Sequence, residues 1–588
     1  MNYANPLRFG VMCKTGGISQ FGRACIENIT RDGLAQPHLL ILDPTVVRPS
    51  GMSTKLRKVV RLEGNLSYLH SKLWPSEDIP AYKKQSLDEC CPSVDRVVCT
   101  PELRGKWSQH FSAADIETIR AHKLDFILKF AFGILRGDVL TAAEYGVWSF
   151  HHGDEEKYRG GPPAFWEIYY RDPVTAALLQ RLTERLDGGV VLKKCFVPTH
   201  GLSHRKNLQR IQDSSAHMVR WVSLDILNGR AEYLSAPPSK TRASIYRAPN
   251  DFQVLRFWTQ LARNWLRYKI DNQRVDQWNV GLVKAPQSAF LDPAFRPTIE
   301  WSGYREHIQF VADPFLLPAP DNLVDGAARI MVEELNWSTE RGRICELRID
   351  GDGHTSITPL IDDGLHLSYP FAFVHNGVTY AMPECSESRA IRLYRLNPAT
   401  GAWSPDHVLI ENIDAVDATV FEYQDRWWLL HSGTKGCAPW SLYVWHAPDL
   451  LGPWQPHTAN PVKTDVRGSR PGGNVFWHEG QLYRPAQDGR YHYGYGLAIQ
   501  RIDELTRETY RETTVREMAP DPRGEYRDGF HTLSGFGDYS VVDGKKHTWP
   551  VWFLMSRFLA KRLRMRRKEF RYKNVAVESS LPVKQSGS

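Results

Sequence analysis

Three segments in the second half of the chain share one order of residues: a strand-like run, a polar turn and an aromatic, strand-like run. They read VHNGVTYAMPE from Val374, EYQDRWWLLHS from Glu422 and WHEGQLYRPAQ from Trp477. A second element, LYRLNPATGAWSP or LYVWHAPDLLGPWQP, follows the first two segments. Repeats of about 50 residues that carry four strands each are typical of β-propeller blades. This repeat constrains the fold of the second half more than any other feature of the sequence.

The same half contains five runs that have the character of innermost blade strands. They are VADPFLL, LSYPFAF, DATVFEY, RPGGNVF and FHTLSGF. A further run, WNVGLVKAP near Trp278, is expected to supply a strand that closes the ring. We therefore predict an all-β, five-bladed propeller over residues 278–550.

The first two hundred residues follow a different pattern. The strand-like runs LRFGVMC, HLLILD and DFILKFAF alternate with the helix-like runs FGRACIENITRDGL and PAFWEIYYRD. This alternation predicts an α/β fold with an open, largely parallel sheet, in which ligands bind at the carboxyl ends of the strands. We predict an α/β domain over residues 1–215, a linker with helices over 216–277, and a basic C-terminal helix and tail over 551–588.

Positive charge is concentrated near the C-terminus. The chain of 588 residues has a net charge of +8, and SRFLAKRLRMRRKEFRYK (Ser556–Lys573) is strongly basic. Two interpretations remain open: a solvated terminal helix, or an interfacial helix whose Phe558, Leu559 and Leu563 contact an anionic membrane. No base-stacking motif accompanies the basic run, so we expect no nucleic-acid partner.

Cysteine usage and targeting patterns bear on the compartment. The nine cysteines are scattered without a CxxC pair, which favours a reducing environment. The sequence shows neither a signal-peptide pattern nor a run of about 20 apolar residues that would span a bilayer. We expect a cytoplasmic protein, with peripheral contact at the inner membrane surface if the basic run is interfacial.

One stretch of the first domain, SFHHGDEEKYRGGPPAFWE (Ser149–Glu167), follows the strand-like run GVWSF, where a ligand site of such a sheet is expected. Together with its continuation to RLTERLDGGVVL, it resembles the pattern of methionyl-tRNA, glycinamide-ribonucleotide and sugar N-formyltransferases. That pattern runs N-x-H, a loop ending in Y-R-G, a proline and a helix, and L-D-x-G. The resemblance covers most of the first two hundred residues and implies acyl transfer from 10-formyltetrahydrofolate.

The family's catalytic Asn, His and Asp fall by position on Ser149, His151 and Asp187. An amine that attacks a formyl carbon generates an oxyanion and loses a proton, and a histidine oriented by an aspartate serves both needs. Ser149 stands where the family has Asn. Three outcomes follow: the domain is a slow enzyme, it uses a different acyl donor or acceptor, or it is inactive. His152 or a water is the candidate replacement donor. The resemblance also implies that seven residues contact the cofactor: Phe130, Phe132, Gly133, Ile134, Tyr158, Arg159 and Gly160. The alternative for the last three is that they shape the loop.

The propeller half resembles glycoside hydrolase family 43 and, more closely, the N-terminal domain of plant glucosamine inositolphosphorylceramide transferases. NIDAVDATVFEYQDRWWLL and GPWQPHTANPVKTDVRGSRPGGNVF carry the second resemblance. Family 43 places two aspartates and a glutamate around the axis, and by position these are Asp313, Asp417 and Glu384. The second blade lacks an aspartate and the fourth carries an arginine, so the triad is incomplete. We expect no metal in the propeller. The residues expected to surround its axis either bind an acidic sugar or only hydrate the channel, and they are Asp313, Glu384, Asp417, Arg470 and His531.

Three functions are compatible with these features. The first is a formyltransferase-like enzyme that transfers a formyl or related acyl group to an amino sugar in glycan or glycolipid biosynthesis, with a propeller that binds or processes the glycan. The second is a propeller-based glycosidase or glycosyl-transfer enzyme with a degenerate first domain. The third is a non-catalytic glycan-binding scaffold. In each case the partner is a small-molecule sugar or a glycolipid.

Overall fold

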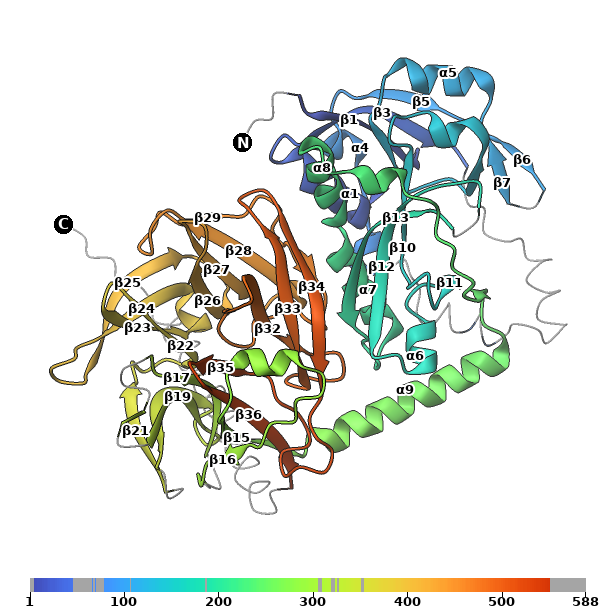
Figure 1. Ribbon diagram of the computed structural model, residues 1–588. Coiled ribbons are helices and arrows are strands. Elements are labelled where there is room, and N and C mark those ends of the chain that lie inside the picture. The colour runs from blue at the N-terminus through green and yellow to red at the C-terminus, as the bar shows by residue number, and fades with distance from the viewer. Residues whose placement is uncertain are drawn as a thin grey trace, which may run out of the picture.

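The computed structural model describes residues 5–45, 66, 69, 79–105, 107–185, 188–304, 309–318, 323–324, 327–350 and 354–549. Within these ranges an α/β domain precedes a β-rich domain, and the long helix α9 (Asp251–Asp271) runs between them (Figure 1). Asp187 and the predicted basic helix and tail over residues 551–588 lie outside the described residues.

A seven-stranded sheet forms the centre of the first domain, with the order β13-β12-β10-β8-β1-β3-β5. Strands β10, β8, β1, β3 and β5 are parallel, whereas β12 and β13 are antiparallel at one edge. This confirms the predicted open, largely parallel α/β sheet, whose strand order reverses between β1 and β8. The strands are β1 Leu7–Lys14, β3 Ala35–Asp43, β5 Asp95–Val98, β8 Phe126–Lys129, β10 Val147–His151, β12 Val174–Arg181 and β13 Val190–Pro198.

Helices cover both faces of this sheet. Helices α1 (Gln20–Thr30), α7 (His204–Ser215) and α8 (Met218–Leu227) pack on the face that carries Phe126 and Trp148. Helix α5 (Ala113–Ala121) packs on the opposite face. Because α8 lies inside the segment predicted to link the domains, the core of the first domain extends beyond residue 215.

Local capping explains where individual helices begin and end. Ser19 caps α1, since its Oγ accepts a hydrogen bond from the Gly22 N–H at 3.1 Å. The predicted helix PAFWEIYYRD shortens to α6 (Trp166–Tyr170), because Arg171 adopts the left-handed backbone with φ 62°. The short elements of this domain and of the connection are β2 Ile18–Ser19, β4 Lys84–Gln85, α4 Leu87–Cys90, β6 Glu102–Arg104, β7 Ser108–His110, β9 Ile134–Arg136, β11 Arg159–Gly160 and β14 Ile245–Tyr246.

The β-rich domain consists of five antiparallel sheets. Four of them are formed by strands that follow one another along the chain. Their strands are β17 Gln309–Leu316, β18 Leu323–Val324, β19 Ala327–Asn336, β20 Arg341–Ile349 and β21 Thr355–Ile361; β22 Ser368–His375, β23 Val378–Glu384, β24 Ala390–Leu396 and β25 Trp403–Glu411; β26 Val416–Glu422, β27 Trp427–Ser432, β28 Ser441–Ala447, β29 Gln455–Pro456 and β30 Lys463–Thr464; and β31 Phe476–His478, β32 Gln481–Asp488, β33 Gly496–Leu505 and β34 Tyr510–Met518.

The remaining sheet joins the two ends of the β-rich domain. It has the order β16-β15-β36-β35, with β15 Val275–Val283, β16 Glu300–Trp301, β35 Leu533–Phe536 and β36 Tyr539–Thr548. Strand β15 pairs with β36 along its whole length, from Val275 opposite Thr548 to Val283 opposite Ser540. The run near Trp278 therefore completes the sheet that contains the last strands of the domain.

The two domains contact each other through α8, the strand β13 and the loop after β29. Trp221 Nε1 donates to Pro461 O at 2.6 Å, and Arg220 donates to Thr458 O at 2.7 Å. His217 Nε2 lies 3.0 Å from Thr464 Oγ1. Burial lowers the pKa of His217 to about 3. This histidine is therefore neutral in the folded interface.

The charge state of His217 predicts a pH dependence of stability. Below about pH 6.5 the unfolded chain binds a proton that the folded chain does not take up until about pH 3, so stability falls as the pH falls through this window. At pH 5 the loss attributable to His217 is about 2 kcal/mol. We expect His217→Gln, which keeps a hydrogen-bonding amide, to reduce the difference between chemical unfolding at pH 7 and pH 5.

His478→Gln, at a half-exposed position on β31, is the matched control and should leave that difference unchanged. Identical pH slopes for wild type and His217→Gln would contradict this account of the interface.

Candidate functional site

The first candidate site lies where β8 and β10 end, next to the point at which the strand order reverses. Lys129 pairs in register with Ser149, and His151 lies two residues further along β10. Side chains alternate between the faces of a strand and paired residues share a face. Lys129, Ser149 and His151 therefore lie on one face of the sheet. This is the edge at which open α/β sheets bind their ligands.

His151 is oriented by the loop that follows it. Its Nε2 donates to Tyr158 O at 2.9 Å, which leaves Nδ1 as the proton acceptor of the neutral ring. Within the part of the chain that the structure describes, Nδ1 makes no hydrogen bond. Asp187, the predicted orienting residue, lies outside the described residues, so its approach to His151 stays a prediction.

Lys129 begins the run KFAFGIL (Lys129–Leu135), which the family resemblance predicts to line the cofactor pocket, but no role for the lysine itself was predicted. Burial lowers the pKa of its ammonium group to about 8. Among the residues in the described ranges, no carboxylate or hydrogen-bond acceptor pairs with its Nζ. A half-buried cation beside Ser149 is available to an anionic group of a ligand, and only the register of β8 on β10 reveals it.

His152 does not share this face. It stacks at 6.1 Å on Phe150 and lies edge-on to Phe21 at 5.2 Å, with Nε2 3.4 Å from Ser215 Oγ. Burial, followed by the neighbouring His151, lowers its pKa to about 3. His152 is a neutral core residue, so it does not replace the family's Asn.

The aromatic residues predicted to contact a cofactor follow Lys129 in the chain and are half-buried. Phe130 packs against Phe21 at 6.2 Å, and Phe132, with φ 68°, packs against Phe111 at 5.2 Å. Gly133 is exposed, and its N–H donates to the Gln109 side chain. Ile134 lies in β9, which pairs with β7.

The loop residues predicted alongside them are held by the connection between the domains. Tyr158 donates its hydroxyl to Asp172 at 3.3 Å, and its ring lies 5.8 Å from Tyr246. Arg159 and Gly160 form β11, which pairs with β14. Gly160 has φ 84°, and a Cβ there would collide with Tyr246 O. These contacts support a role in shaping the loop that orients His151.

The second candidate site is built on a repeated backbone distortion. Asp313 in the middle of β17, and Tyr369 and Asp417 at the second positions of β22 and β26, have φ values of 50°, 43° and 54°. Each lies at a register shift of its strand pair. Left-handed backbone at such residues costs about 1–3 kcal/mol each and concentrates at functional sites. In the sequence, the repeated runs ADPF, SYPF and VDATVF mark the positions of this backbone distortion.

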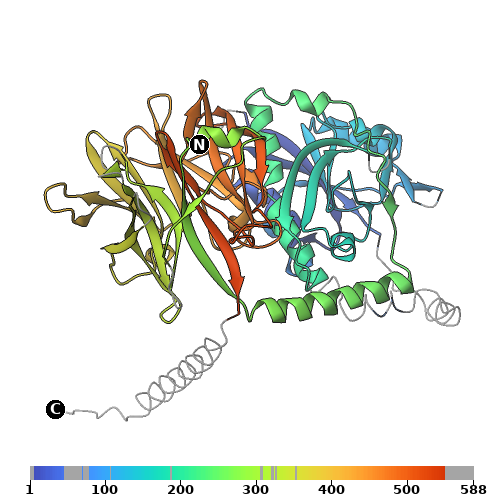
Figure 2. The ribbon, with the colours of Figure 1, turned by 60° about the horizontal axis from the view of Figure 1, so that its bottom comes forward.

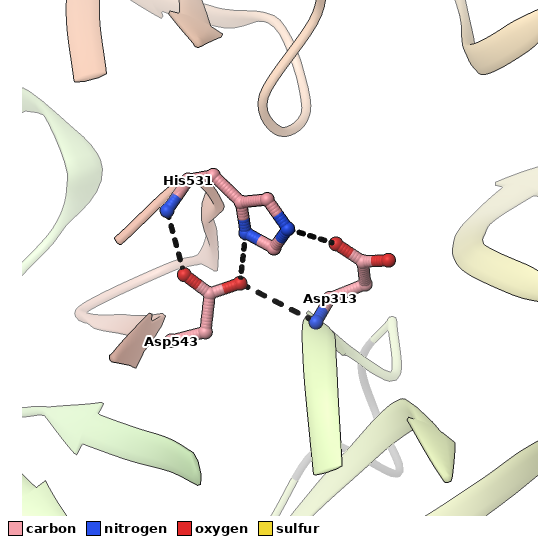
Figure 3. A group of neighbouring side chains, drawn as sticks. All are labelled: Asp313, His531 and Asp543. Carbon is pink, nitrogen blue, oxygen red and sulfur yellow. Dashed lines mark hydrogen bonds and ion pairs between the residues drawn. The ribbon is translucent and has the colours of Figure 1, made fainter. Parts of the chain in front are cut away.

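Asp313, His531 and Asp543 form one end of this site (Figure 3). His531 Nδ1 lies 2.6 Å from Asp543 Oδ2, and His531 Nε2 lies 3.6 Å from Asp313 Oδ1. Thr532 donates its hydroxyl to Asp313 at 3.0 Å, and the Tyr369 N–H donates to the same carboxylate at 3.2 Å. One ligand atom from each of the three residues in Figure 3 lies within 4.8 Å of the others, a spacing that a cation can bridge, although the sequence predicted no metal.

Glu384, Asp417 and Arg470 form the other end. Asp417 N–H donates to Glu384 Oε2 at 2.9 Å. Arg470 Nε forms an ion pair with Asp417 Oδ2, which also accepts from Gln487 Nε2 at 2.9 Å. The structure thus places all five predicted axial residues in two hydrogen-bonded groups. It adds Asp543 and Gln487, which no local pattern marked.

Burial sets the protonation of this acidic group. Burial, followed by the charge of Asp417, raises the pKa of Glu384 to about 8, with Arg470 opposing. Burial also raises the pKa of Asp313 to about 6, although His531 opposes the shift. Glu333, buried nearby, has a pKa raised well above its ordinary value by burial and by Asp313. Burial alone would lower the pKa of His531, but Asp543 and Asp313 raise it.

Tyr493 covers this group. About half of its side chain is exposed, but its hydroxyl lies 3.1 Å from His531 Nε2 and its ring packs 5.1 Å from the Arg470 guanidinium. A half-exposed ring, hydrogen-bond donors and the protonated carboxyl of Glu384 can bind the hydroxyl groups of a sugar and exchange protons with it.

Comparison with known proteins finds relatives for both parts of the chain. Residues 297–528 match the family model described as "Glucosamine inositolphosphorylceramide transferase 1, N-terminal". The transferase of that name from rice (Oryza sativa subsp. japonica) is 35% identical over 215 residues, which are 35% of this chain and 28% of the rice protein. Methionyl-tRNA formyltransferase from Prochlorococcus marinus is 30% identical over 140 residues, 23% of this chain and 38% of that enzyme.

A solved structure, the exo-β-1,3-galactanase 1,3Gal43A from Clostridium thermocellum, aligns with a TM-score of 0.29 and 15% identity over 35% of this chain and 49% of that one. The matched parts of the curated relatives are well under two thirds of their lengths. The chain thus joins a segment similar to methionyl-tRNA formyltransferases to a segment similar to the N-terminal part of glucosamine inositolphosphorylceramide transferases, as the sequence motifs predicted.

Proposed function

We propose that the first domain transfers a formyl group from 10-formyltetrahydrofolate to the amine of an amino sugar, and that the β-rich domain binds the glycan. One observation carries the proposal: Lys129, Ser149 and His151 share one face of the sheet at its ligand-binding edge. Similarity to methionyl-tRNA formyltransferases supports the reaction class. The relatives of the second part are named for glucosamine, an amino sugar, and inositolphosphorylceramide, a sphingolipid with a phosphoinositol headgroup, which supports an amino-sugar or lipid-linked acceptor.

The three residues fit an acyl transfer to an amine. Bound 10-formyltetrahydrofolate would supply the formyl carbon. As the amine attacks that carbon, the new C–N bond forms, the bond to the donor nitrogen breaks, and negative charge develops on the acyl oxygen. His151 Nδ1 is free to take the amine proton and to return it to the departing nitrogen. The Lys129 ammonium and the Ser149 hydroxyl stabilise the charged oxygen, where the family uses an Asn amide.

We further propose that the five sheets are the blades of a five-bladed propeller. Hydrogen bonds connect neighbouring sheets in order: Thr532 to Asp313, Tyr369 to Asp313, and Asp417 to Glu384. In a propeller these residues would surround the axis, where glycan-binding sites of such folds lie. The acidic group beneath Tyr493 would then receive the sugar.

A second function is favoured by the pKa of Glu384. A carboxyl with a pKa of about 8, adjacent to the ion-paired carboxylate of Asp417, offers a proton donor at neutral pH. The β-rich domain would then cleave or transfer a glycosidic bond itself. Release of free sugar that survives His151→Ala but not Glu384→Gln would support this second function.

The first function is tested with the purified full chain, 10-formyltetrahydrofolate and a panel of nucleotide-linked amino sugars and glycosylated lipids, with N-formyl products detected by mass spectrometry. We expect Lys129→Met to lower single-turnover rates about 10²- to 10³-fold, the usual cost of one oxyanion donor. We expect Ser149→Asn to restore much of the rate in the Lys129→Met background, because the longer amide replaces the lost donor.

Lys123→Met, at an exposed lysine before β8, is the control and should leave the rate unchanged. No formyl product from the wild type with any acceptor would reject the proposed function itself. Full activity of Lys129→Met would reject only the role of the lysine.

A further inference from the structure

Helix α9 packs on the first domain through its N-terminal two thirds, up to Asn264. Phe257 is buried and stacks on Phe165, with ring centroids 4.2 Å apart. Gln260 is buried as well, and Asn264 Nδ2 donates to Gly201 O at 2.8 Å. Beyond Asn264, every residue of α9 is exposed. The last two turns of the helix therefore contribute nothing to the core of either domain.

The outward face of α9 carries an apolar stripe. Phe252 is 72% exposed and Leu266 is 56% exposed. Scattered exposed apolar residues are normal, but a continuous row on one helix marks an interaction surface. Five exposed apolar residues and one threonine, whose hydroxyl donates to Arg256 O at 2.7 Å, recur at helical spacing along this row: Phe252, Leu255, Thr259, Ala262, Leu266 and Ile270.

Basic and aromatic residues flank the stripe. Arg256, Arg263 and Arg267 run along one side, and all three are exposed. The Arg256 guanidinium packs over the Tyr169 ring at 4.5 Å, and Arg267 lies 4.0 Å from Asp271, so Arg263 and Arg267 are the arginines that face solvent on the outer turns. On the other side Lys269 Nζ lies 5.5 Å from the ring of Trp265, which is 55% exposed. Residues 251–274 contain five basic and two acidic side chains. An apolar row between arginines and tryptophan is the composition of a helix that lies in a membrane interface.

The outward residues of α9 are exposed in the part of the chain that the structure describes. The helix runs along one edge of the molecule, beneath the α/β domain, and its C-terminal end reaches the β-rich domain (Figure 2). It leads into β15, whose first residue, Val275, pairs with Thr548, and the Arg274 guanidinium lies 5.2 Å from the ring of Trp549. The apolar and basic sequence that follows Trp549 thus begins beside the C-terminal end of α9. None of the described helices is long and apolar enough to cross a bilayer.

We propose that the outward face of α9 is a docking surface for an anionic lipid bilayer, on which the helix lies parallel to the membrane plane. The apolar row enters the boundary between headgroups and acyl chains, and Arg263 and Arg267 bind lipid phosphates. This surface is separate from both candidate sites. It would hold the two domains against a membrane from which a lipid-linked acceptor could be reached.

The test is cosedimentation of the full chain with vesicles of phosphatidylcholine alone or with phosphatidylserine. We expect binding to the anionic vesicles that weakens with salt. Arg263→Gln combined with Arg267→Gln should lower the partition coefficient about thirtyfold, since each basic residue near the surface contributes about fivefold. Leu266→Ser combined with Ile270→Ser should lower it at every salt concentration, because the apolar contribution is not screened.

Two controls isolate the helix from general surface effects. Trp477→Ser removes an aromatic ring that is 55% exposed on β31, and Arg523→Gln removes a cation with a 91% exposed side chain; neither should change vesicle binding. The proposal is overturned if the α9 variants bind like the wild type while Arg564→Gln with Arg566→Gln abolishes binding. It is also overturned if the α9 variants change only the oligomeric state, measured by light scattering, because the stripe would then cover a second copy.

Discussion

Replacing His151 by alanine is expected to lower the rate of formyl transfer about 10²- to 10⁴-fold, the range for loss of a general acid–base group. Two acid–base groups lie near Ser149 on this face: Lys129, which the proposed mechanism assigns to the acyl oxygen, and the His151 imidazole, whose Nε2 is held by Tyr158 O at 2.9 Å. Without the imidazole, Lys129 remains as a cation committed to the acyl oxygen, and the amine proton loses its acceptor. Single-turnover measurements at saturating acceptor give the effect directly.

His151→Gln separates this chemistry from support of the loop. The glutamine amide can donate to Tyr158 O as the imidazole does, but it cannot accept a proton at neutral pH. We therefore expect both variants to fold, as judged by circular dichroism and thermal unfolding, and both to be slow. A wild-type rate for either variant would locate the proton acceptor elsewhere and remove His151 from the mechanism.

Arg470→Met is expected to destabilise the β-rich domain by about 3–5 kcal/mol, the usual cost of removing one partner from a buried ion pair. The reason is the acidity around it: Asp417 is almost fully buried, Arg470 is the cation paired with it, and the neighbouring Glu384 is another carboxyl group. The loss of Arg470 leaves the Asp417 carboxylate with Gln487 as its remaining hydrogen-bond donor. Chemical unfolding followed by tryptophan fluorescence measures the change.

Asp417→Asn in the Arg470→Met background should recover a large part of that loss, because the uncompensated charge is removed. The control is Arg348→Met, at a pair with Asp350 in which both side chains are 36% exposed; exposed pairs contribute about 0–1 kcal/mol. Equal effects of Arg470→Met and Arg348→Met would show that the charge of Asp417 is screened by solvent.

Local periodicity in the sequence was enough to predict most strands of the β-rich domain and to predict which of them lie innermost in their sheets. Four of the five innermost runs became strands at the expected places, in β17, β22, β26 and β35. The fifth, RPGGNVF, contributes only its last residue, Phe476, to the short strand β31, because Gly473 has φ 142° and the preceding residues make a single bridge from Pro471 to Ala486. Glycine and proline there favour close approach of backbone over a regular ladder.

The candidate sites were predictable only in part, for a related reason. His151 and Asp313 stand in recognisable motifs, whereas Lys129 and Asp543 gain their importance from a neighbouring strand. Lys129 lies beside Ser149 because of the register of β8 on β10. Asp543, a residue of β36, contacts His531, which precedes β35 in the chain. The register between two strands depends on how whole faces of the sheet pack. A short stretch of sequence does not carry that information.

The pairing of β15 with β36 also governs when the β-rich domain can complete its fold during synthesis. Strand β15 emerges first, and its partner follows more than 250 residues later, at Tyr539–Thr548. The α/β domain has all its described strands by Pro198, so it can fold on the ribosome while β15 is still unpaired. Until the last strand is released, β15 exposes an open edge that invites pairing with a neighbouring nascent chain. Translation speed over the final sheets is therefore expected to influence the yield of correctly folded protein.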